Sequence, residues 1–159
     1  MIVYVDILFI NMKLETFMID VNDNTNLKEA KELILEKSFV YPEEQIWFLD
    51  NIPIKTLKIN WKKALEKKSK FSIIVNNLWY SFKIKNMMGT IVDINYLSSR
   101  DKISTIKYHI YEKTGMYPES YRLFYKGNEE LKDFEFIGKY FIPNNAMINL
   151  ILKMNSGLI

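Results

Sequence analysis

Histidine and cysteine, two residue types that often serve as nucleophiles, general bases and zinc ligands, are almost absent from this 159-residue chain. His109 is the only histidine, and cysteine is absent. A histidine acts as a general base or a zinc ligand only with suitable partners, and no pair of acidic ligands stands close to His109 in the sequence. The absence of cysteine excludes thiolate metal ligands, cysteine nucleophiles and disulfides. We therefore expect His109 to be a solvated surface residue, and we expect no enzymatic activity, metal or cofactor.

Lysines dominate residues 62–70, which read KKALEKKSK. Such a stretch can contact nucleic acid or anionic lipid, but a solvated face is its more common role. The net charge of the chain is only +3, which does not indicate nucleic-acid binding. No window is apolar enough to span a bilayer, and charges interrupt the N-terminal segment, so neither a membrane span nor a signal peptide is expected. These features predict a cytoplasmic monomer without nucleic-acid or membrane partners.

The chain spells nearly the same eight letters twice. Residues 36–43 read EKSFVYPE and residues 112–119 read EKTGMYPE, 76 positions later. Other positions match at the same offset, including Leu27 with Ile103 and Ile34 with Ile110. An internal repeat of this length predicts two homologous units in tandem, each with its own core. We expect domains at residues 1–76 and 79–157, joined by a linker too short to let them move independently.

The second unit begins with two alternating runs, Phe82–Ile84 and Val92–Tyr96, with Gly89 between them. This pattern predicts a β-hairpin whose apolar residues face one side. Two strands are expected near the end of the unit, over residues 122–125 and 147–153.

A helix should follow the hairpin and position the residues after it. The capping oxygens predict where the helix begins. The apolar stripe predicts its buried face, and the glycine predicts where it ends. The stripe consists of Ile103, Ile106 and Ile110, the candidate caps are Ser98, Ser99 and Asp101, and the glycine is Gly115.

Residues 82–157 resemble ubiquitin over essentially its full length. The resemblance is carried by the hairpin glycine Gly89, by Asp101 before the helix and by the helical stripe Ile103, Ile106 and Ile110. It is also carried by three sequence stretches: EKxGxxP at Glu112 to Pro118, RLFYKG at Arg122 to Gly127 and LILK at Leu150 to Lys153. It implies an α+β fold of two tandem β-grasp domains, each with a mixed sheet packed on one helix.

The first unit resembles ubiquitin less closely. No glycine occurs before Gly89, and Phe39 stands where Gly115 ends the second helix. A bulky residue in the left-handed conformation costs about 1 kcal/mol or more. We therefore expect the first helix to end differently, and residues 58–69 also diverge from the family pattern.

The C-terminal segment matches the part of ubiquitin-like modifiers that is activated and joined to a lysine of a target. The match places Lys153 and Asn155 at the two arginine positions of ubiquitin, Met154 between them, and Ser156 and Gly157 at the diglycine. Leu158 and Ile159 then resemble a short extension that a protease removes. The departures, Lys for Arg and Ser-Gly for Gly-Gly, imply a dedicated activating enzyme. The alternative is an ordinary frayed end.

Alternation along the strand at residues 122–125 sends Leu123 and Tyr125 to one face and Arg122 and Phe124 to the other. In the last strand Ile148, Leu150 and Leu152 are expected inward, with Asn149 and Ile151 outward beside Phe124. With Met87 in the hairpin loop, these outward residues resemble the apolar recognition patch of ubiquitin. Phe48 is the expected counterpart in the first unit, with Trp47 inward. The alternative is that Phe124 is a core residue.

Two tandem ubiquitin-like units resemble the vertebrate interferon-induced two-domain modifier and the modifiers of bacterial antiphage conjugation operons of the Bil type. The resemblance implies antiviral or antiphage defence, with activating (E1-like) and conjugating (E2-like) enzymes, a deubiquitinase-like protease and target proteins as partners. Lys107 and Lys113 match lysines used for chain building in ubiquitin. The second hypothesis is a non-covalent adaptor or decoy that presents ubiquitin-like surfaces without being conjugated.

Overall fold

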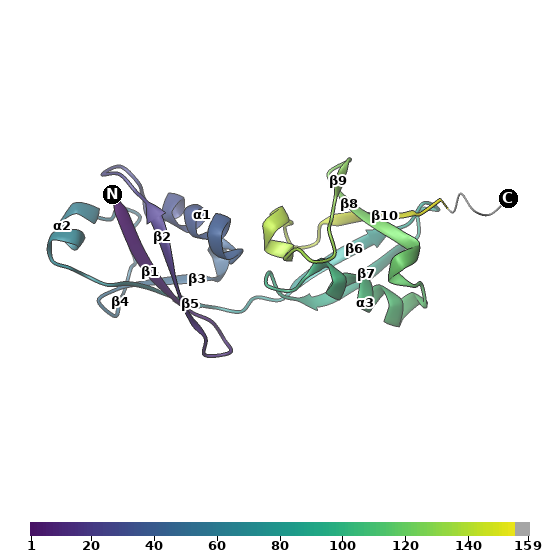
Figure 1. Ribbon diagram of the computed structural model, residues 1–159, viewed down its shortest axis with the longest axis horizontal. Coiled ribbons are helices and arrows are strands. Elements are labelled where there is room, and N and C mark those ends of the chain that lie inside the picture. Colours follow the sequence, from purple (N-terminus) through teal and green to yellow (C-terminus); the bar gives the residue numbers. More distant parts are fainter. Residues whose placement is uncertain (155–159) are drawn as a thin grey trace. The chain divides into compact units, whose positions relative to one another are not determined.

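The computed structural model describes residues 1–154, and the chain divides into two compact units, Met1–Leu78 and Trp79–Ile159. Each unit contains a five-stranded sheet and a long helix. Figure 1 shows the helix of each unit lying across one face of its sheet.

Residues 79–154 of the second unit form five strands, one α-helix and two short 3-10 turns. In chain order they are β6 (Tyr80–Lys85), β7 (Ile91–Leu97), α3 (Ile103–Thr114), η2 (Pro118–Ser120), β8 (Tyr121–Tyr125), β9 (Glu129–Glu130), η3 (Ile137–Tyr140) and β10 (Met147–Leu152).

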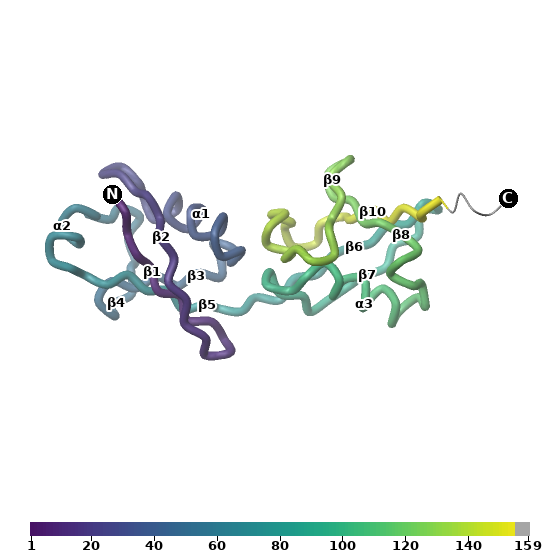
Figure 2. Tube along the Cα trace, viewed as in Figure 1, coloured from purple at the N-terminus to yellow at the C-terminus, as the bar shows by residue number. Residues whose placement is uncertain are grey.

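The sheet of the second unit has the strand order β7-β6-β10-β8-β9. The first and last strands, β6 and β10, are neighbours and run parallel, whereas all the remaining strand pairs are antiparallel. Figure 2 shows these two strands side by side although they are far apart in the sequence. A mixed sheet of this order with one helix on one face is a β-grasp fold, which confirms the predicted fold class.

The hairpin of β6 and β7 forms as its alternation predicts, with Phe82 and Ile84 buried and Gly89 at a φ of 85° in the turn. The prediction was wrong at Tyr96, which is 76% exposed. The register shifts between the pairs Tyr80–Leu97 and Phe82–Ile94, so β7 contains one extra residue. This bulge, in which Tyr96 has a φ of 60°, interrupts the alternation.

Helix α3 buries the predicted stripe, since Ile103, Ile106 and Ile110 are each at most 1% exposed. The helix begins at Ile103, but the prediction of a side-chain cap was wrong. Lys102 is the N-cap residue and makes no side-chain capping hydrogen bond. The Asp101 carboxylate instead accepts a hydrogen bond of 2.8 Å from the backbone N–H of Ser98.

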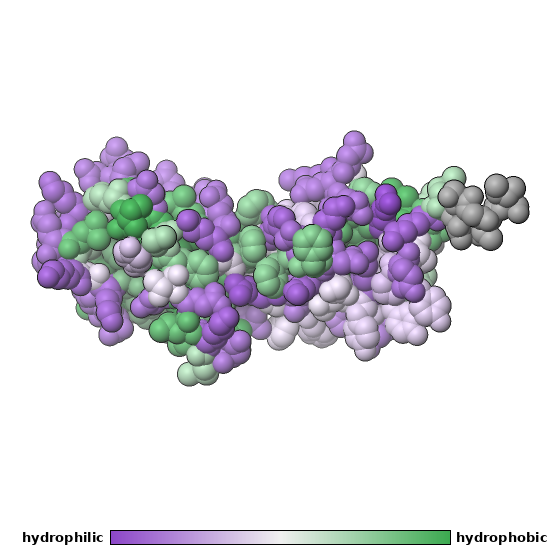
Figure 3. Space-filling model, in the orientation of Figure 1, coloured by the Kyte–Doolittle hydropathy of each residue, from purple (hydrophilic) through white to green (hydrophobic). Residues whose placement is uncertain are grey.

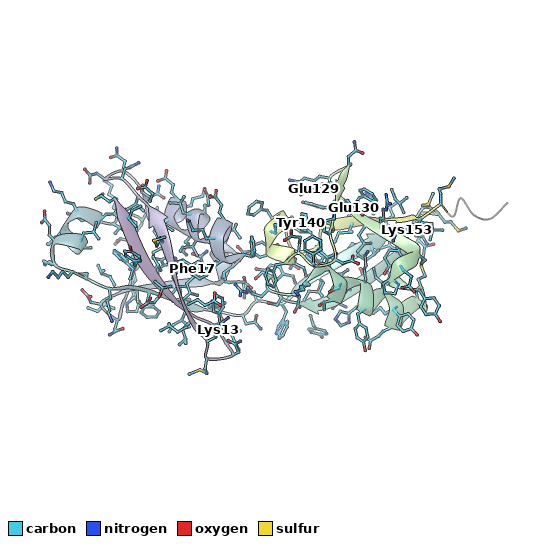
Figure 4. The ribbon with its side chains drawn as sticks, in the orientation of Figure 1. Lys13, Phe17, Glu129, Glu130, Tyr140 and Lys153 are labelled. Atoms are coloured by element: carbon cyan, nitrogen blue, oxygen red, sulfur yellow. The ribbon has the colours of Figure 1, made fainter. Side chains whose placement is uncertain are left out.

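The first N–H groups of α3 are satisfied by the loop that follows β9. Ile103 donates to the Glu135 carbonyl over 2.9 Å, and Ser104 donates to the Asp133 carbonyl over 3.0 Å. The hydroxyl of Tyr140 holds this loop by accepting a hydrogen bond of 2.8 Å from the backbone N–H of Lys132 (Figure 4). Backbone carbonyls from a distant segment thus replace the side-chain caps that the sequence suggested.

The first unit repeats this arrangement with one added helix. Its elements are β1 (Ile2–Leu8), β2 (Leu14–Asp20), α1 (Leu27–Ser38), η1 (Pro42–Glu44), β3 (Gln45–Leu49), β4 (Ile52–Pro53), α2 (Trp61–Glu66) and β5 (Phe71–Val75). The strand order β2-β1-β5-β3-β4 is that of the second unit, with β1 and β5 parallel. The added helix α2 lies in the segment whose sequence diverges from the family pattern.

The core of the first unit is built around large aromatic side chains. Trp47 and Trp61 are at most 2% exposed, and the rings of Trp61 and Phe71 lie 4.9 Å apart. The indole Nε1–H of Trp61 donates a hydrogen bond of 2.7 Å to the carbonyl of Thr25, which precedes α1. The divergent segment therefore supplies a central part of the core.

Both long helices end in the left-handed conformation. Gly115 has a φ of 74° and donates its N–H to the Tyr111 carbonyl, and Phe39 has a φ of 60° and donates to the Leu35 carbonyl. The prediction that Phe39 would change the helix end was therefore wrong. The side chain of Phe39 is half-buried, and tertiary packing of this kind offsets a backbone strain of about 1 kcal/mol.

We expect Gly115→Ala to destabilise the second unit by about 1 kcal/mol. A Cβ at this position would meet no atom within 4 Å, so backbone strain is the only source of the effect. Urea denaturation of the full chain measures the loss. Gly115→Asn is the control and should cost less, because asparagine tolerates this conformation. Equal stability of Gly115→Ala and the unmodified chain would contradict the prediction.

Candidate functional site

The outward face of the second sheet brings together four of the residues expected to bind partners. In the antiparallel pair of β8 and β10, Phe124 lies opposite Asn149 and Arg122 lies opposite Ile151. Their neighbours Leu123, Tyr125, Ile148 and Leu150 are buried under the helix. We call Phe124, Asn149, Ile151 and Arg122 the Phe124 face.

The Phe124 face is only partly apolar and only partly exposed. Ile151 is 43% exposed, Asn149 and Arg122 are exposed, and Phe124 is half-buried. Leu152, which was predicted to point into the core, is 50% exposed. The described pairing of β10 with β6 ends at Asn149, so the end of β10 has a neighbouring strand on one side only and Leu152 is not covered.

Met87 lies at the tip of the hairpin beside this face. Lys85 on β6 is paired with Asn149 on β10, and Met87 comes two positions after Lys85. The Met87 side chain is 67% exposed. The Asn86 side chain orders the turn by accepting hydrogen bonds from the N–H groups of Met88 and Thr90, over 3.0 and 2.9 Å. Met87 is therefore presented on an ordered turn.

Charged groups border the Phe124 face at β9. Glu130 accepts a hydrogen bond of 3.0 Å from Lys132 and lies 3.8 Å from Arg122. The Lys132 ammonium holds the pKa of the Glu130 carboxyl below its usual range. A small pocket of about 300 Å³ is lined by Arg122, Glu130 and Lys153, among others. Glu130 and Lys153 are labelled in Figure 4.

In the first unit Phe48 is half-buried and Trp47 points inward, as the alternation predicts. Phe48 lies opposite Ser72 on β5 and Pro53 on β4. Its face of the sheet is therefore the counterpart of the Phe124 face.

Sequence reasoning missed a row of apolar residues next to Phe48. Leu14 pairs with Leu8, Leu8 pairs with Ile74, and Ile74 pairs with Ile46, so the row crosses four strands. Leu14, Ile74 and Ile46 are 62%, 45% and 42% exposed. Their strands contain consecutive apolar residues, such as Phe17 to Ile19 in β2, and only the register of the four strands reveals the row.

Two residues of the predicted C-terminal site are described. Lys153 donates its backbone N–H to the Ser120 carbonyl over 2.9 Å, and Met154 is 96% exposed. Asn155, Ser156, Gly157 and Leu158 lie outside the described residues.

The remaining candidates differ in their surroundings. His109 is partly exposed, with Nδ1 3.4 Å from Glu112. Lysines 62, 63, 67, 68 and 70 are exposed, which agrees with a solvated basic face. Lys113 is exposed, and its ammonium donates a hydrogen bond to the Asp93 carbonyl.

Lys107, the other lysine that matches a chain-building lysine of ubiquitin, is only 5% exposed. Its ammonium lies 2.6 Å from Asp133 and 5.5 Å from the ring centre of Tyr121. Burial, aided by the Asp133 charge, raises the pKa of the Tyr121 hydroxyl. The position of Lys107 is therefore structural and its ammonium is poorly accessible.

Among residues 1–154, no group of three or more histidine and acidic side chains is placed to hold a metal ion. Within the same range no helix has the length and apolar character needed to cross a bilayer.

Comparison with known proteins identifies the second unit. The family model described as "Ubiquitin family" matches residues 82–155. The ubiquitin-like protein NEDD8 of Dictyostelium discoideum is 30% identical over 76 residues, which cover 48% of this chain and 96% of that protein. Ubiquitin-like protein 1 of Schizosaccharomyces pombe is 28% identical over 75 residues, covering 47% of this chain and 94% of that protein. With its β-grasp strand order and these relatives, the chain belongs to the ubiquitin family.

Proposed function

We propose that this protein is a two-domain ubiquitin-like modifier that is joined through Gly157 to target proteins after removal of Leu158 and Ile159. Its domains would be residues 1–76 and 79–157. Activating and conjugating enzymes and a deubiquitinase-like protease would be its partners, and antiviral or antiphage defence its setting. The match, which covers 96% and 94% of two ubiquitin-like proteins, supports this proposal.

One structural observation carries the proposal furthest. Strand β10 ends at Leu152, and the two residues that follow are exposed, with Met154 at 96%. Attachment through a C-terminal glycine requires the segment before it to be accessible to other enzymes. The described residues that lead to Gly157 meet this requirement.

The test is to express the chain with an N-terminal tag in its source organism and to purify it under denaturing conditions. Mass spectrometry should find adducts in which the Gly157 carboxyl forms an amide with a lysine Nζ of another protein. Gly157→Ala should remove these adducts, because a Cβ next to the reacting carboxyl would obstruct a narrow catalytic channel. Ser156→Gly is the matched control and should preserve them. Adducts that persist in Gly157→Ala would disprove attachment through this residue.

A non-covalent adaptor or decoy is the second candidate, and the Phe124 face favours it as much as it favours a modifier. Exposed Ile151 beside Phe124 can bind a partner without any reaction at the C-terminus. A chain that retains Leu158 and Ile159 and forms no adducts, yet binds enzymes of the ubiquitin pathway, would support this candidate.

We expect Phe124→Ala to weaken binding of the activating enzyme or the protease at least about tenfold, as the loss of a central apolar contact does. The unfolding free energy should fall by no more than about 1.5 kcal/mol because the side chain is only half-buried. Calorimetric titration and urea denaturation measure the two effects. Phe141→Ala, at a residue that is 53% exposed on the same unit and lies outside the Phe124 face, is the control. A stability loss above about 3 kcal/mol would show that Phe124 is a core residue.

A further inference from the structure

A groove on helix α3 is formed by residues other than those of the Phe124 face. It has a volume of about 330 Å³ and is lined by Ser104, Lys107, Tyr108, Tyr111, Tyr117, Pro118 and Asp133. Figure 3 shows pale, weakly polar side chains gathered over the region of α3. Its lining comes from the helix, from the segment that follows it and from the loop that caps its N-terminus.

Three tyrosines give this groove its character, and we call it the tyrosine groove. Tyr108, Tyr111 and Tyr117 are 56%, 40% and 62% exposed. Tyr108 and Tyr111 are three residues apart on α3 and so lie on the same side of the helix. The rings of Tyr111 and Tyr117 pack with their centres 5.5 Å apart. The left-handed turn at Gly115 reverses the chain so that Tyr117 returns to the helix.

The charge of the groove is set by carboxylates near its edge. Lys107 lines the groove, its ammonium is neutralised by Asp133 at 2.6 Å, and the Asp133 side chain is still 58% exposed. Glu112 is 50% exposed and lies 3.4 Å from Nδ1 of His109, and its carboxylate raises the pKa of the Tyr108 hydroxyl. Glu119 directly follows Pro118 and is also exposed. Acidic groups therefore outnumber basic ones here.

Nearby cations do not reverse this balance. Lys132 and Arg122 lie in the adjoining pocket beyond Asp133, where both are close to Glu130, at 3.0 and 3.8 Å. The ammonium of Lys113 donates to the Asp93 carbonyl on β7. A positively charged ligand is thus the best electrostatic match to the tyrosine groove.

We propose that the tyrosine groove is a docking site for an arginine side chain on an extended segment of a partner protein. A guanidinium stacks on aromatic faces while its N–H groups remain free to donate to carboxylate and phenol oxygens. Tyrosine and arginine are also the residues that contribute most often to binding energy at protein interfaces. The groove is large enough for one such side chain and a short stretch of backbone.

Other occupants fit this chemistry less well. A nucleic acid can stack its bases on tyrosine, but its phosphates would be repelled by Asp133, Glu112 and Glu119. An apolar helix would bury the tyrosine hydroxyls and the Asp133 carboxylate without offering them donors. The proposal does not depend on conjugation through Gly157, because it concerns a surface of the folded second unit.

The probe is the capped peptide acetyl-Gly-Ser-Arg-Ser-Gly-amide, titrated into the ¹⁵N-labelled full chain and followed by NMR. We expect saturable shifts of the amides of Tyr108, Tyr111 and Tyr117. The same peptide with citrulline, which keeps the shape of arginine but is neutral, should bind about fivefold more weakly or worse. Tyr111→Leu should reduce the affinity for the arginine peptide to a similar extent, and added salt should also weaken binding.

Tyr4→Leu is the matched control, because Tyr4 is 62% exposed on β1 of the first unit and lies outside the groove. It should leave the affinity unchanged. The proposal is overturned if the citrulline peptide binds as tightly as the arginine peptide, or if Tyr111→Leu binds normally. It is also overturned if the arginine peptide produces no saturable shift at these tyrosines.

Discussion

Replacing Trp61 by alanine should cost the first unit about 4 kcal/mol of unfolding free energy. A unit of this size has a total stability of roughly 4 to 12 kcal/mol, so the first unit of the variant should unfold well below the temperature at which the unmodified unit does. Trp61 is 1% exposed and packs on Phe71. The substitution leaves a cavity in the core and also leaves the Thr25 carbonyl without its indole donor.

The measurement is amide hydrogen exchange followed by NMR, which reports on the two units separately. Amides of β1 and β5 should lose protection in Trp61→Ala while those of β6 and β10 keep theirs. Trp61→Phe retains most of the ring but not the donor, and should cost about 1–3 kcal/mol. Trp79→Ala, at a site that is 59% exposed, should have little effect. A change below about 1 kcal/mol in Trp61→Ala would contradict the central role of this side chain.

The second large effect is expected at the ion pair between Lys107 and Asp133. Its two members differ in exposure, with 7% of the lysine side chain and 58% of the aspartate side chain accessible. Asp133→Ala leaves a buried ammonium without its carboxylate and should cost about 3 kcal/mol. Lys107→Met removes the buried charge, fills a similar volume and leaves a carboxylate that water can solvate, so it should cost less than about 1.5 kcal/mol.

Urea denaturation of both variants and of the double variant measures this asymmetry. The double variant should resemble Lys107→Met, because the penalty in Asp133→Ala comes from the uncompensated ammonium. A larger loss in Lys107→Met than in Asp133→Ala would mean that packing of the lysine chain, and not its charge, dominates. Since Lys107 is buried, we also expect it to accept a modifier far less readily than the exposed Lys113.

The sequence predicted the fold well where local pattern and tertiary structure agree. The stripe of α3, the helix end at Gly115 and the hairpin around Gly89 follow from periodicity and from the conformational freedom of glycine. The errors occur where tertiary contacts override local preference. A bulge turns Tyr96 outward, and the half-buried Phe39 adopts the conformation that glycine favours.

Alternation within a single strand is enough to predict which residues of the Phe124 face point outward. Alternation predicts that Phe124 and Ile151 face outward, and in the pairing of β8 with β10 they lie diagonally, with Phe124 opposite Asn149 and Ile151 opposite Arg122. The apolar row of the first unit required the register of four strands, which no single segment encodes. The burial of Lys107 depends on Asp133 and Tyr121, and neither neighbour can be identified from a helical pattern.

The parallel pairing of first and last strands has a mechanical consequence for each unit. Because β1 runs parallel to β5, and β6 to β10, the points where the chain enters and leaves a unit lie at opposite ends of the paired strands. A pull on the two ends of a unit would therefore load the hydrogen bonds between these strands in shear, all at once, and would not open them one by one. Each unit should resist being threaded through a narrow pore by a molecular motor. Whether the unit unfolds would depend on how firmly the motor can grip the chain.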